Sequence, residues 1–252
     1  MKVTLLQMDI AWASPRENIR RAEELISATD DDTELYVLPE MWATGFAVEP
    51  ESIAEEERSS EALSWMRQTA LQRRCAVSGS LAVSIDDGSY RNRHYFVTPQ
   101  GLAFYDKHHL FGYGHENENY TRGERAVTVD WHGARILLLT CYDLRFPVFS
   151  RYGRAGEYDV IVCVANWPAK RQQAWDVLTR ARAIENQCYV VAVNRTGSDP
   201  ACEYGGGSLV ADPKGNAIII GDNSHKHLSA SLDLKRLQEM RHNFRVLDDR
   251  DV

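Results

Sequence analysis

The sequence predicts an α/β fold in which a single layered domain spans residues 1–252 and contains a mixed β-sheet. Short apolar runs of strand length alternate with segments of helical periodicity along the whole chain. Several of these runs carry Val and Ile on both faces, which is typical of strands covered on both sides. No proline-rich or serine-rich linker, internal repeat or low-complexity tract divides the chain, so one domain is expected.

The expected strands are short apolar runs bounded by turn residues. They cover residues 2–7, 35–38, 75–83, 93–97, 103–106, 126–129, 136–140, 160–164, 189–194, 208–211, 217–220 and 228–232. Hairpins are expected where glycine-containing turns separate strands, at Asp87-Gly88, Pro99-Gln100-Gly101 and Asp212-Pro213-Lys214-Gly215.

The expected helices show apolar residues at intervals of three and four positions. They cover residues 15–28, 60–73, 148–154, 172–187 and 234–241. The first has a clear start signal, because Ser14 can cap it and Pro15 suits the first helical position.

The composition is that of an ordinary globular protein, with 44% hydrophobic and 26% charged residues. The formal net charge of −7 and the lack of a basic run argue against nucleic acid or an anionic membrane as the main partner. The first residues lack the features of a signal peptide, and no stretch approaches a membrane span. Five cysteines without CxxC spacing suit reduced thiols in a cytoplasmic protein better than disulfides.

The strongest candidate for chemistry is Cys141. The apolar run 136–140 brings it to a strand end, and a polar turn leads toward a helix that starts near Pro147. In this position the following backbone N–H groups and the positive end of the helix can stabilise both a thiolate and an oxyanion. A buried, inert cysteine fits the same segment equally well.

Two further strand ends supply complementary groups. Glu40 follows the run 35–38, and Lys107 follows the run 103–106. Each alone is an ordinary solvent-facing charge. With Cys141 they form a reactive set, because a carboxylate can take the thiol proton, a thiolate can attack a carbonyl and an ammonium can hold the oxyanion.

These three segments resemble the signature motifs of the nitrilase, or carbon–nitrogen hydrolase, superfamily, and they occur in that family's order. The motifs are Pro39-Glu40, Tyr105-Asp106-Lys107-His108 and Cys141-Tyr142-Asp143-Leu144-Arg145-Phe146-Pro147. The resemblance extends to Val164-Ala165-Asn166-Trp167-Pro168, residues 180–186 and Gly207-Ser208. It implies a four-layer α-β-β-α sandwich with mixed sheets, frequent pairing into homodimers or larger oligomers, a Glu-Lys-Cys triad, and neither metal nor cofactor.

The resemblance also implies a role for each catalytic residue. Glu40 would act as general base and then general acid, Lys107 as the oxyanion-stabilising cation and Cys141 as the nucleophile. The family carries a second glutamate seven residues before a glycine. Glu116 stands at that distance from Gly123, although Glu118 lies in the same loop.

Within the family, residues 41–46, 165–168 and 194–199 most resemble the omega-amidase branch, which deamidates small 2-oxo acid amides such as 2-oxoglutaramate and 2-oxosuccinamate. A pocket for such an acid needs a cation, preferably an arginine, and Arg145, Arg171 and Arg195 are the candidates. The residues expected to bind substrate are Phe46, Tyr142 (through its backbone N–H), Arg145, Asn166, Trp167 and Arg171.

Several other functions are compatible with parts of the sequence. Within the same chemistry the substrate could be an N-carbamoyl amino acid, a deaminated peptide amide or a nitrile. A catalytically silent oligomeric binding protein of the same fold is disfavoured by the intact set of Glu40, Lys107 and Cys141. A metalloenzyme is disfavoured because the histidines, among them His108, His109, His115, His225 and His227, show no metal-binding spacing.

Overall fold

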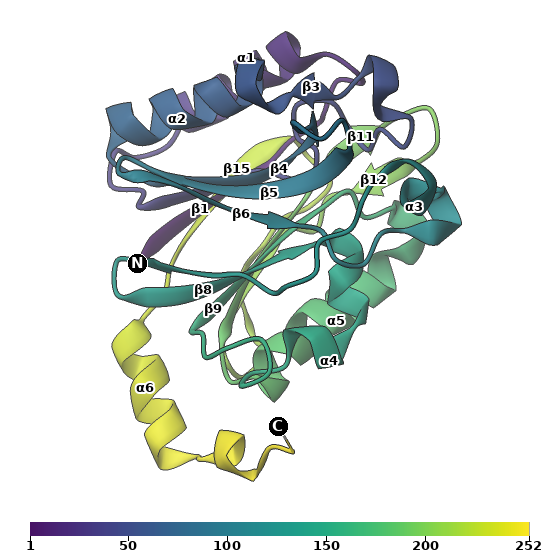
Figure 1. Ribbon diagram of the computed structural model, residues 1–252. Coiled ribbons are helices and arrows are strands. Elements are labelled where there is room, and N and C mark those ends of the chain that lie inside the picture. The colour runs from purple at the N-terminus through teal and green to yellow at the C-terminus, as the bar shows by residue number, and fades with distance from the viewer. Residues whose placement is uncertain (252) are drawn as a thin grey trace.

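Two mixed β-sheets pack face to face in the computed structural model, which describes residues 1–251 (Figure 1). The first sheet has the strand order β15 (Lys226–Ser231), β1 (Lys2–Gln7), β2 (Leu35–Val37), β4 (Ala76–Ser84), β5 (Tyr90–Thr98) and β6 (Gly101–Asp106), with β3 (Glu55–Glu56) paired to β4. The second has the order β14 (Ala217–Ile220), β13 (Leu209–Ala211), β10 (Tyr189–Asn194), β9 (Val160–Ala165), β8 (Ala134–Thr140) and β7 (Thr128–Trp131). A separate hairpin contains β11 (Thr196–Ser198) and β12 (Glu203–Gly205).

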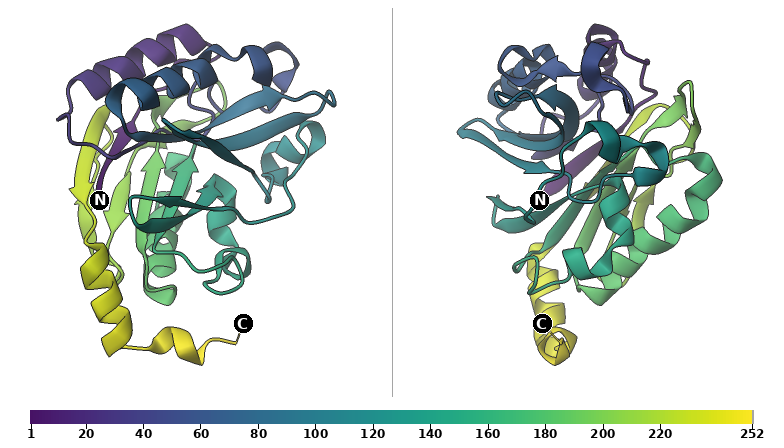
Figure 2. Two further views of the ribbon diagram at one scale, coloured as in Figure 1. Left: turned by 60° about the vertical axis from the view of Figure 1, so that its left-hand side comes forward. Right: turned by 45° about the vertical axis from the view of Figure 1, so that its right-hand side comes forward.

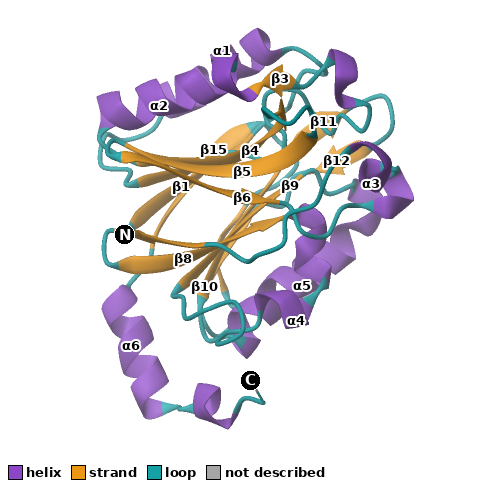
Figure 3. Ribbon diagram, viewed as in Figure 1, coloured by secondary structure: helices purple, strands orange, loops and turns teal. Residues whose placement is uncertain are grey.

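Helices cover the outer faces of the two sheets (Figures 2 and 3). Helices α1 (Pro15–Ser27) and α2 (Glu61–Arg73) lie over the first sheet, and α4 (Pro147–Ser150) and α5 (Gln172–Glu185) lie beside the second. The short α3 (Glu116–Asn119) lies at the edge, and α6 (Leu234–Asn243) extends beyond the sheets toward the C-terminus. The expected four-layer α-β-β-α sandwich with mixed sheets is therefore confirmed.

The apolar strands contribute to three hydrophobic cores: one between the two sheets, one between the first sheet and helices α1 and α2, and one between the second sheet and α5. In β8, Ile136 and Leu138 belong to the core between the sheets, whereas Leu137 and Leu139 belong to the core beneath α5. In β2, Leu35 and Val37 face the other sheet while Tyr36 faces the helices. Successive side chains of a strand point to opposite faces, so strands covered on both sides must be apolar throughout.

The strand directions bring several carboxyl ends to one edge of the sandwich. Strands β1, β2 and β4 are parallel, and so are β8, β9 and β10. The hairpins β4–β5 and β5–β6 are antiparallel, so β6 runs in the direction of β4. Strands β2 and β6 therefore end on one side of the first sheet, and β8 and β9 end on one side of the second. The hydrogen bond from the Asn166 N–H, after β9, to Glu40, after β2, shows that these ends meet, and ligand sites of α/β sheets are usually found at such ends.

The structure differs from the expected elements at a few places. The helix expected over residues 148–154 is wrong, because α4 is a single turn, Pro147–Ser150. The chain cannot continue as a helix, since Gly153 (φ +93°) and Gly156 (φ +88°) adopt left-handed conformations and form a bridge with each other. Strand β5 begins at Tyr90 rather than residue 93, β7 is shifted to Thr128–Trp131, and the short β3, β11, β12 and α3 were not expected.

All five cysteines are free thiols. Within residues 1–251, none of the helices has the length and apolar character needed to cross a membrane.

A buried histidine links the two sheets. The His94 ring on β5 contacts Ser78 Oγ (2.8 Å) through Nε2 and the Leu139 carbonyl oxygen on β8 (3.2 Å) through Nδ1. Burial lowers the pKa of His94 to about 3, against an ordinary value of 6.5, although the Leu139 carbonyl and Asp143 oppose this shift. The ring is therefore neutral in the folded protein near neutral pH.

This histidine should make the folded state sensitive to mild acid. The unfolded chain takes up a proton at His94 below pH 6.5 while the folded protein does not, so stability is lost as the pH falls below 6.5. Between pH 6.5 and about 5.5, wild type should lose about 1 kcal/mol more free energy of unfolding than His94→Gln. Urea unfolding at the two pH values measures this difference, and an equal pH dependence in both proteins would contradict it.

Candidate active site

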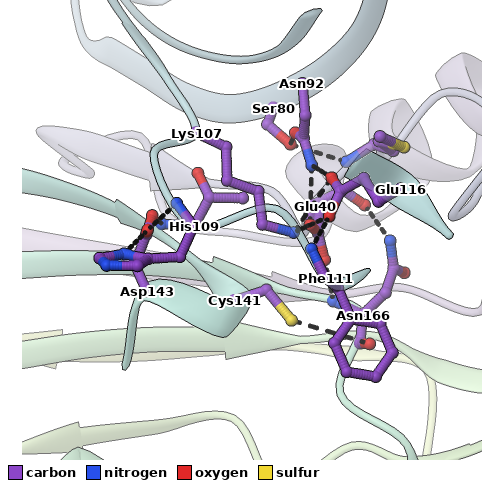
Figure 4. A network of polar contacts seen from close by, with 12 residues as sticks. Glu40, Ser80, Asn92, Lys107, His109, Phe111, Glu116, Cys141, Asp143 and Asn166 are labelled. Atoms are coloured by element: carbon purple, nitrogen blue, oxygen red, sulfur yellow. Dashed lines mark hydrogen bonds and ion pairs between the residues drawn. The ribbon is translucent and has the colours of Figure 1, made fainter. Parts of the chain in front are cut away.

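Four strand ends place polar side chains in one buried cluster (Figure 4). Glu40 follows β2 and Lys107 follows β6, both in the first sheet. Cys141 follows β8 and Asn166 follows β9, both in the second sheet. The cluster therefore lies where the carboxyl ends of strands from both sheets meet.

The Lys107 ammonium occupies the centre of the cluster. Its Nζ donates to Glu40 Oε1 (2.8 Å) and to both carboxylate oxygens of Glu116 (2.8 and 3.1 Å), and all three side chains are 0% exposed. Burial by itself favours loss of the proton, but the charges of Glu116 and Glu40 outweigh it and raise the pKa of Lys107 well above its ordinary value. Lys107 is therefore a permanent cation.

Glu40 is fixed through both of its carboxylate oxygens. Oε1 accepts from Lys107 and from Asn92 Nδ2 (2.8 Å), and Oε2 accepts from the backbone N–H of Asn166 (2.9 Å). Asn166 also donates from Nδ2 to the Glu40 carbonyl oxygen (2.7 Å). The end of β9 in the second sheet thus orients the carboxylate that the first sheet presents.

The structure distinguishes the two glutamates of the loop. Glu116 is buried, and besides Lys107 it accepts from Asn92 Nδ2 (2.9 Å) and the backbone N–H of Phe111 (2.7 Å). Burial raises the pKa of Glu116 even though the Lys107 charge opposes the shift. Glu118 is exposed and contacts only His115 in this loop, at 2.8 Å.

Gly123 closes the loop that contains Glu116 against the strand that carries Lys107. Its backbone N–H donates to the Lys107 carbonyl oxygen (3.0 Å), and a Cβ at this position would lie 2.1 Å from the carbonyl oxygen of Asp106. Only glycine permits such a close approach. This contact accounts for a glycine at the end of the loop that contains Glu116.

Cys141 occupies a strained turn at the end of β8. Its φ of +46° is left-handed, and Met41, next to Glu40, has a φ of +41°. Non-glycine residues in this region cost about 1–3 kcal/mol each and persist only where the surrounding structure holds them. The Cys141 Sγ lies 3.9 Å from the Asn166 carbonyl oxygen.

The turn that holds Cys141 does not lead directly into a helix end. Residues Cys141–Arg145 form a short 3₁₀ turn, and α4 begins only at Pro147. Burial first, and then the negative charge of Glu40, raise the pKa of Cys141 well above its ordinary value, while Lys107 has a smaller opposite effect. These surroundings favour the protonated thiol over the thiolate.

Cys141 and Lys107 line a cleft of about 460 Å³. The cleft also contains every residue expected to bind substrate, namely Phe46, Tyr142, Arg145, Asn166, Trp167 and Arg171. Its mouth includes the 78%-exposed Tyr113. A larger hollow, of about 1100 Å³, lies beside α6 and shares none of these residues.

The three candidate arginines lie in different surroundings. The Arg145 guanidinium carbon lies 4.9 Å from the centre of the Trp167 ring, and that of Arg171 lies 5.3 Å from the Tyr113 ring. Arg195 does not line the cleft, because its fully buried guanidinium donates to the carbonyl oxygens of Ile10, Thr196 and Ser198. Arg195 therefore holds the backbone, and of the three candidates Arg145 and Arg171 line the cleft.

Sequence reasoning missed Asn92, which donates to both Glu40 and Glu116 and accepts from Ser80 Oγ (2.8 Å). The only signal in the sequence that could have pointed to Asn92 was its polar side chain within a strand whose neighbouring residues are mostly buried. It also missed Asp143, a buried carboxylate inside the cysteine motif that binds Tyr105, His109 and Thr140.

Three of the histidines considered for a metal have other partners. His109 contacts Asp143, His108 contacts the Gly123 carbonyl oxygen and His115 contacts Glu118. Over residues 1–251, no group of three or more His, Cys, Asp or Glu side chains has an arrangement that could hold a metal ion.

Known proteins resemble this chain over almost its whole length. An omega-amidase of Escherichia coli, YafV, is 41% identical over all of this chain and 97% of its own. A 2-oxoglutaramate amidase of Bacillus subtilis is 35% identical over 98% of this chain and 96% of its own. The crystal structure of a CN-hydrolase superfamily protein from Xanthomonas campestris covers 100% of this chain and 97% of its own, with a TM-score of 0.95 and 34% identity. Residues 2–242 match the family model described as carbon-nitrogen hydrolase, and the chain belongs to that family.

Proposed function

We propose that this protein hydrolyses the terminal amide of a small 2-oxo acid amide, of the 2-oxoglutaramate or 2-oxosuccinamate type, to the acid and ammonia. The observation that carries the proposal is the position of Cys141 in a cleft with the buried Lys107, which is paired to Glu40 and Glu116. The omega-amidase and the 2-oxoglutaramate amidase among the relatives support the same substrate class.

In the acylation step, Glu40 takes the proton of the Cys141 thiol while the sulfur forms a bond to the amide carbon. Negative charge then develops on the former carbonyl oxygen. The Lys107 ammonium and the backbone N–H of Tyr142 stabilise this oxyanion. Because burial and the Glu40 charge raise the pKa of Cys141, proton transfer and attack are expected to occur together, without a preformed thiolate.

In the second half of the cycle, Glu40 gives its proton to the amide nitrogen as the carbon–nitrogen bond breaks, and ammonia leaves. The acyl group remains as a thioester on Cys141. Glu40 then takes a proton from a water molecule whose oxygen bonds to the thioester carbon. As the carbon–sulfur bond breaks and the acid leaves, Glu40 returns this proton to the Cys141 sulfur and the thiol is restored. Glu116 holds Lys107 in place throughout, through contacts of 2.8 and 3.1 Å.

Recognition of the substrate falls to groups around the cleft. Asn166 Oδ1 is buried and has no hydrogen-bond partner among the described residues, so it can accept an N–H of the amide. Phe46 and Trp167 form apolar walls. Arg145 binds the distal carboxylate, because it lies on the same short turn as Cys141, whereas Arg171 lies beside the exposed Tyr113 at the mouth.

We also propose that the protein is a cytoplasmic homodimer. Its five free thiols suit a reducing compartment. Val177 and Ile184 on α5 are 58% and 53% exposed and lie on one helix face, and Ile218 and Ile220 on the edge strand β14 are also exposed. An apolar patch of this kind is typical of a subunit interface.

The first prediction concerns the nucleophile. Cys141→Ala should abolish ammonia release from 2-oxoglutaramate with the fold retained, and Cys141→Ser should largely do so. Cys202→Ser is the matched control, because Cys202 lines the same cleft but has no role in the mechanism, and it should keep wild-type activity. Full activity in Cys141→Ala would refute the mechanism. Ammonia release from glutamine, an N-carbamoyl amino acid and an aliphatic nitrile, measured in parallel, separates the other specificities of the family.

The second prediction concerns the distal carboxylate. Arg145→Ala should lower kcat/KM for 2-oxoglutaramate by about 10- to 100-fold, mainly through KM, because a charged hydrogen bond is lost. Arg171→Ala is the matched control and should have a smaller effect. Steady-state kinetics with an uncharged aliphatic amide should show little change in either variant. The opposite ranking of the two variants would assign the carboxylate to Arg171.

The third prediction concerns the oligomer. Wild type should have the mass of a dimer by size-exclusion chromatography with light scattering, and Ile184→Asp should shift it toward the monomer because a charge would be buried in the interface. Leu71→Asp is the control. Leu71 is exposed on α2, which covers the other sheet, so this variant should remain dimeric. A monomeric wild type would exclude this interface.

A further inference from the structure

Asp143 is a buried carboxylate that joins three segments of the active site. Its Oδ2 accepts from the Tyr105 hydroxyl (2.7 Å) and the backbone N–H of Thr140 (3.0 Å). Its Oδ1 accepts from the backbone N–H of His109 (3.0 Å) and contacts His109 Nδ1 (2.9 Å). The side chain is 0% exposed, so these contacts replace all of its hydration.

The partners of Asp143 lie on either side of the two reactive residues. Tyr105 and His109 flank Lys107 in the first sheet, and Thr140 directly precedes Cys141 in the second. The Tyr105 hydroxyl also accepts from the backbone N–H of His108 (2.9 Å), which tightens the turn just after Lys107. In Figure 4, Asp143 and His109 lie together to the left of both Lys107 and Cys141.

We infer that Asp143 is a positioning residue, which sets the Lys107 ammonium relative to the Cys141 sulfur. It does so by hydrogen-bonding both to the residues around Lys107 (the lysine turn) and to the residue before Cys141 (the cysteine turn). The inference rests on the proposed function for the roles of Lys107 and Cys141. Asp143 itself does not touch the reacting atoms. It acts through the backbone on both sides.

Only a carboxylate fits this position. Its two oxygens accept from the Tyr105 hydroxyl and the Thr140 N–H on one side, and from the backbone N–H and ring of His109 on the other. An asparagine would turn an NH₂ group toward one of these pairs of donors. Burial, and then the Asp143 charge, raise the pKa of Tyr105 well above its ordinary value, so the hydroxyl remains a donor. The His109 ring is also held in place, because it stacks on Phe146 at 3.8 Å between ring centres.

The clamp also explains how a strained nucleophile turn is maintained. Cys141 has a left-handed φ of +46°, and the bond from the Thr140 N–H to Asp143 closes the turn around it. Loss of the Asp143 carboxylate would remove this bond and also the bonds to Tyr105 and His109, so both the cysteine and the lysine turns would relax. A displacement of about 1 Å between catalytic groups can lower a rate about 100-fold.

The test compares Asp143→Asn and Tyr105→Phe with wild type. Asp143→Asn should lower kcat about 100-fold and change KM less than about threefold, because the substrate contacts remain. Its rate of Cys141 alkylation by iodoacetamide, read by mass spectrometry of that peptide, should fall about tenfold, because Lys107 no longer favours the thiolate. Tyr105→Phe removes one bond without changing the charge and should show a partial effect on both rates.

Asp159→Asn is the matched control. Asp159 also accepts from several segments, namely the backbone N–H of Arg135 and the side chains of Gln238 and Arg241, but it lies away from the cleft. This variant should lose stability in urea while keeping its kcat and alkylation rate. It therefore distinguishes loss of positioning from loss of folding.

Two results would overturn the inference. One is a kcat within about twofold of wild type in both Asp143→Asn and Tyr105→Phe. The other is a loss of kcat that equals the unfolded fraction, with an unchanged alkylation rate in the folded fraction. A wild type that releases no ammonia from any amide would instead refute the proposed function, and the alkylation rates would still test Asp143.

Discussion

The active site depends on keeping one ammonium charged without water. Lys107 is fully buried, and an isolated buried charge would be strongly unfavourable, so its proton is retained only because Glu40 and Glu116 both lie within 2.8 Å. Each carboxylate needs further donors of its own, which Asn92, Asn166 and the backbone of Phe111 supply. This single requirement links the segments that follow β2, β6 and β9 to strand β5.

The same cluster determines the chemistry of the cysteine. Two carboxylates surround one ammonium, and the nearby Glu40 charge adds to the effect of burial in keeping Cys141 protonated. A site that only needed a reactive thiolate would place more positive charge beside the sulfur. This arrangement instead keeps the proton on the sulfur, with the Glu40 carboxylate nearby. In the proposed mechanism, that proton passes through Glu40 to the leaving amine.

The reactive groups come from different sheets, so contacts between the sheets control their geometry. Glu40 and Lys107 belong to the first sheet, and Cys141 to the second. Apolar packing between the sheets is non-directional and sets their spacing only loosely. Directional contacts supply the rest, through Asn166 to Glu40, Asp143 to Tyr105 and His94 to the Leu139 carbonyl oxygen.

The sequence by itself determined most of the strands, most of the helices and the residues at the strand ends, because apolar periodicity and turn residues are local signals. Strand-end positions, complementary chemistry and the family resemblance together grouped Glu40, Lys107 and Cys141 as a candidate set. The division of the strands between two sheets came from family resemblance, since a strand covered on both sides has the same pattern in either sheet. Only the tertiary structure separated Glu116 from Glu118, removed Arg195 from the cleft and revealed Asn92 and Asp143 as partners of the cluster. Those assignments depend on which side chains meet across the sandwich, and contacts between residues far apart in the chain leave no periodic trace in it.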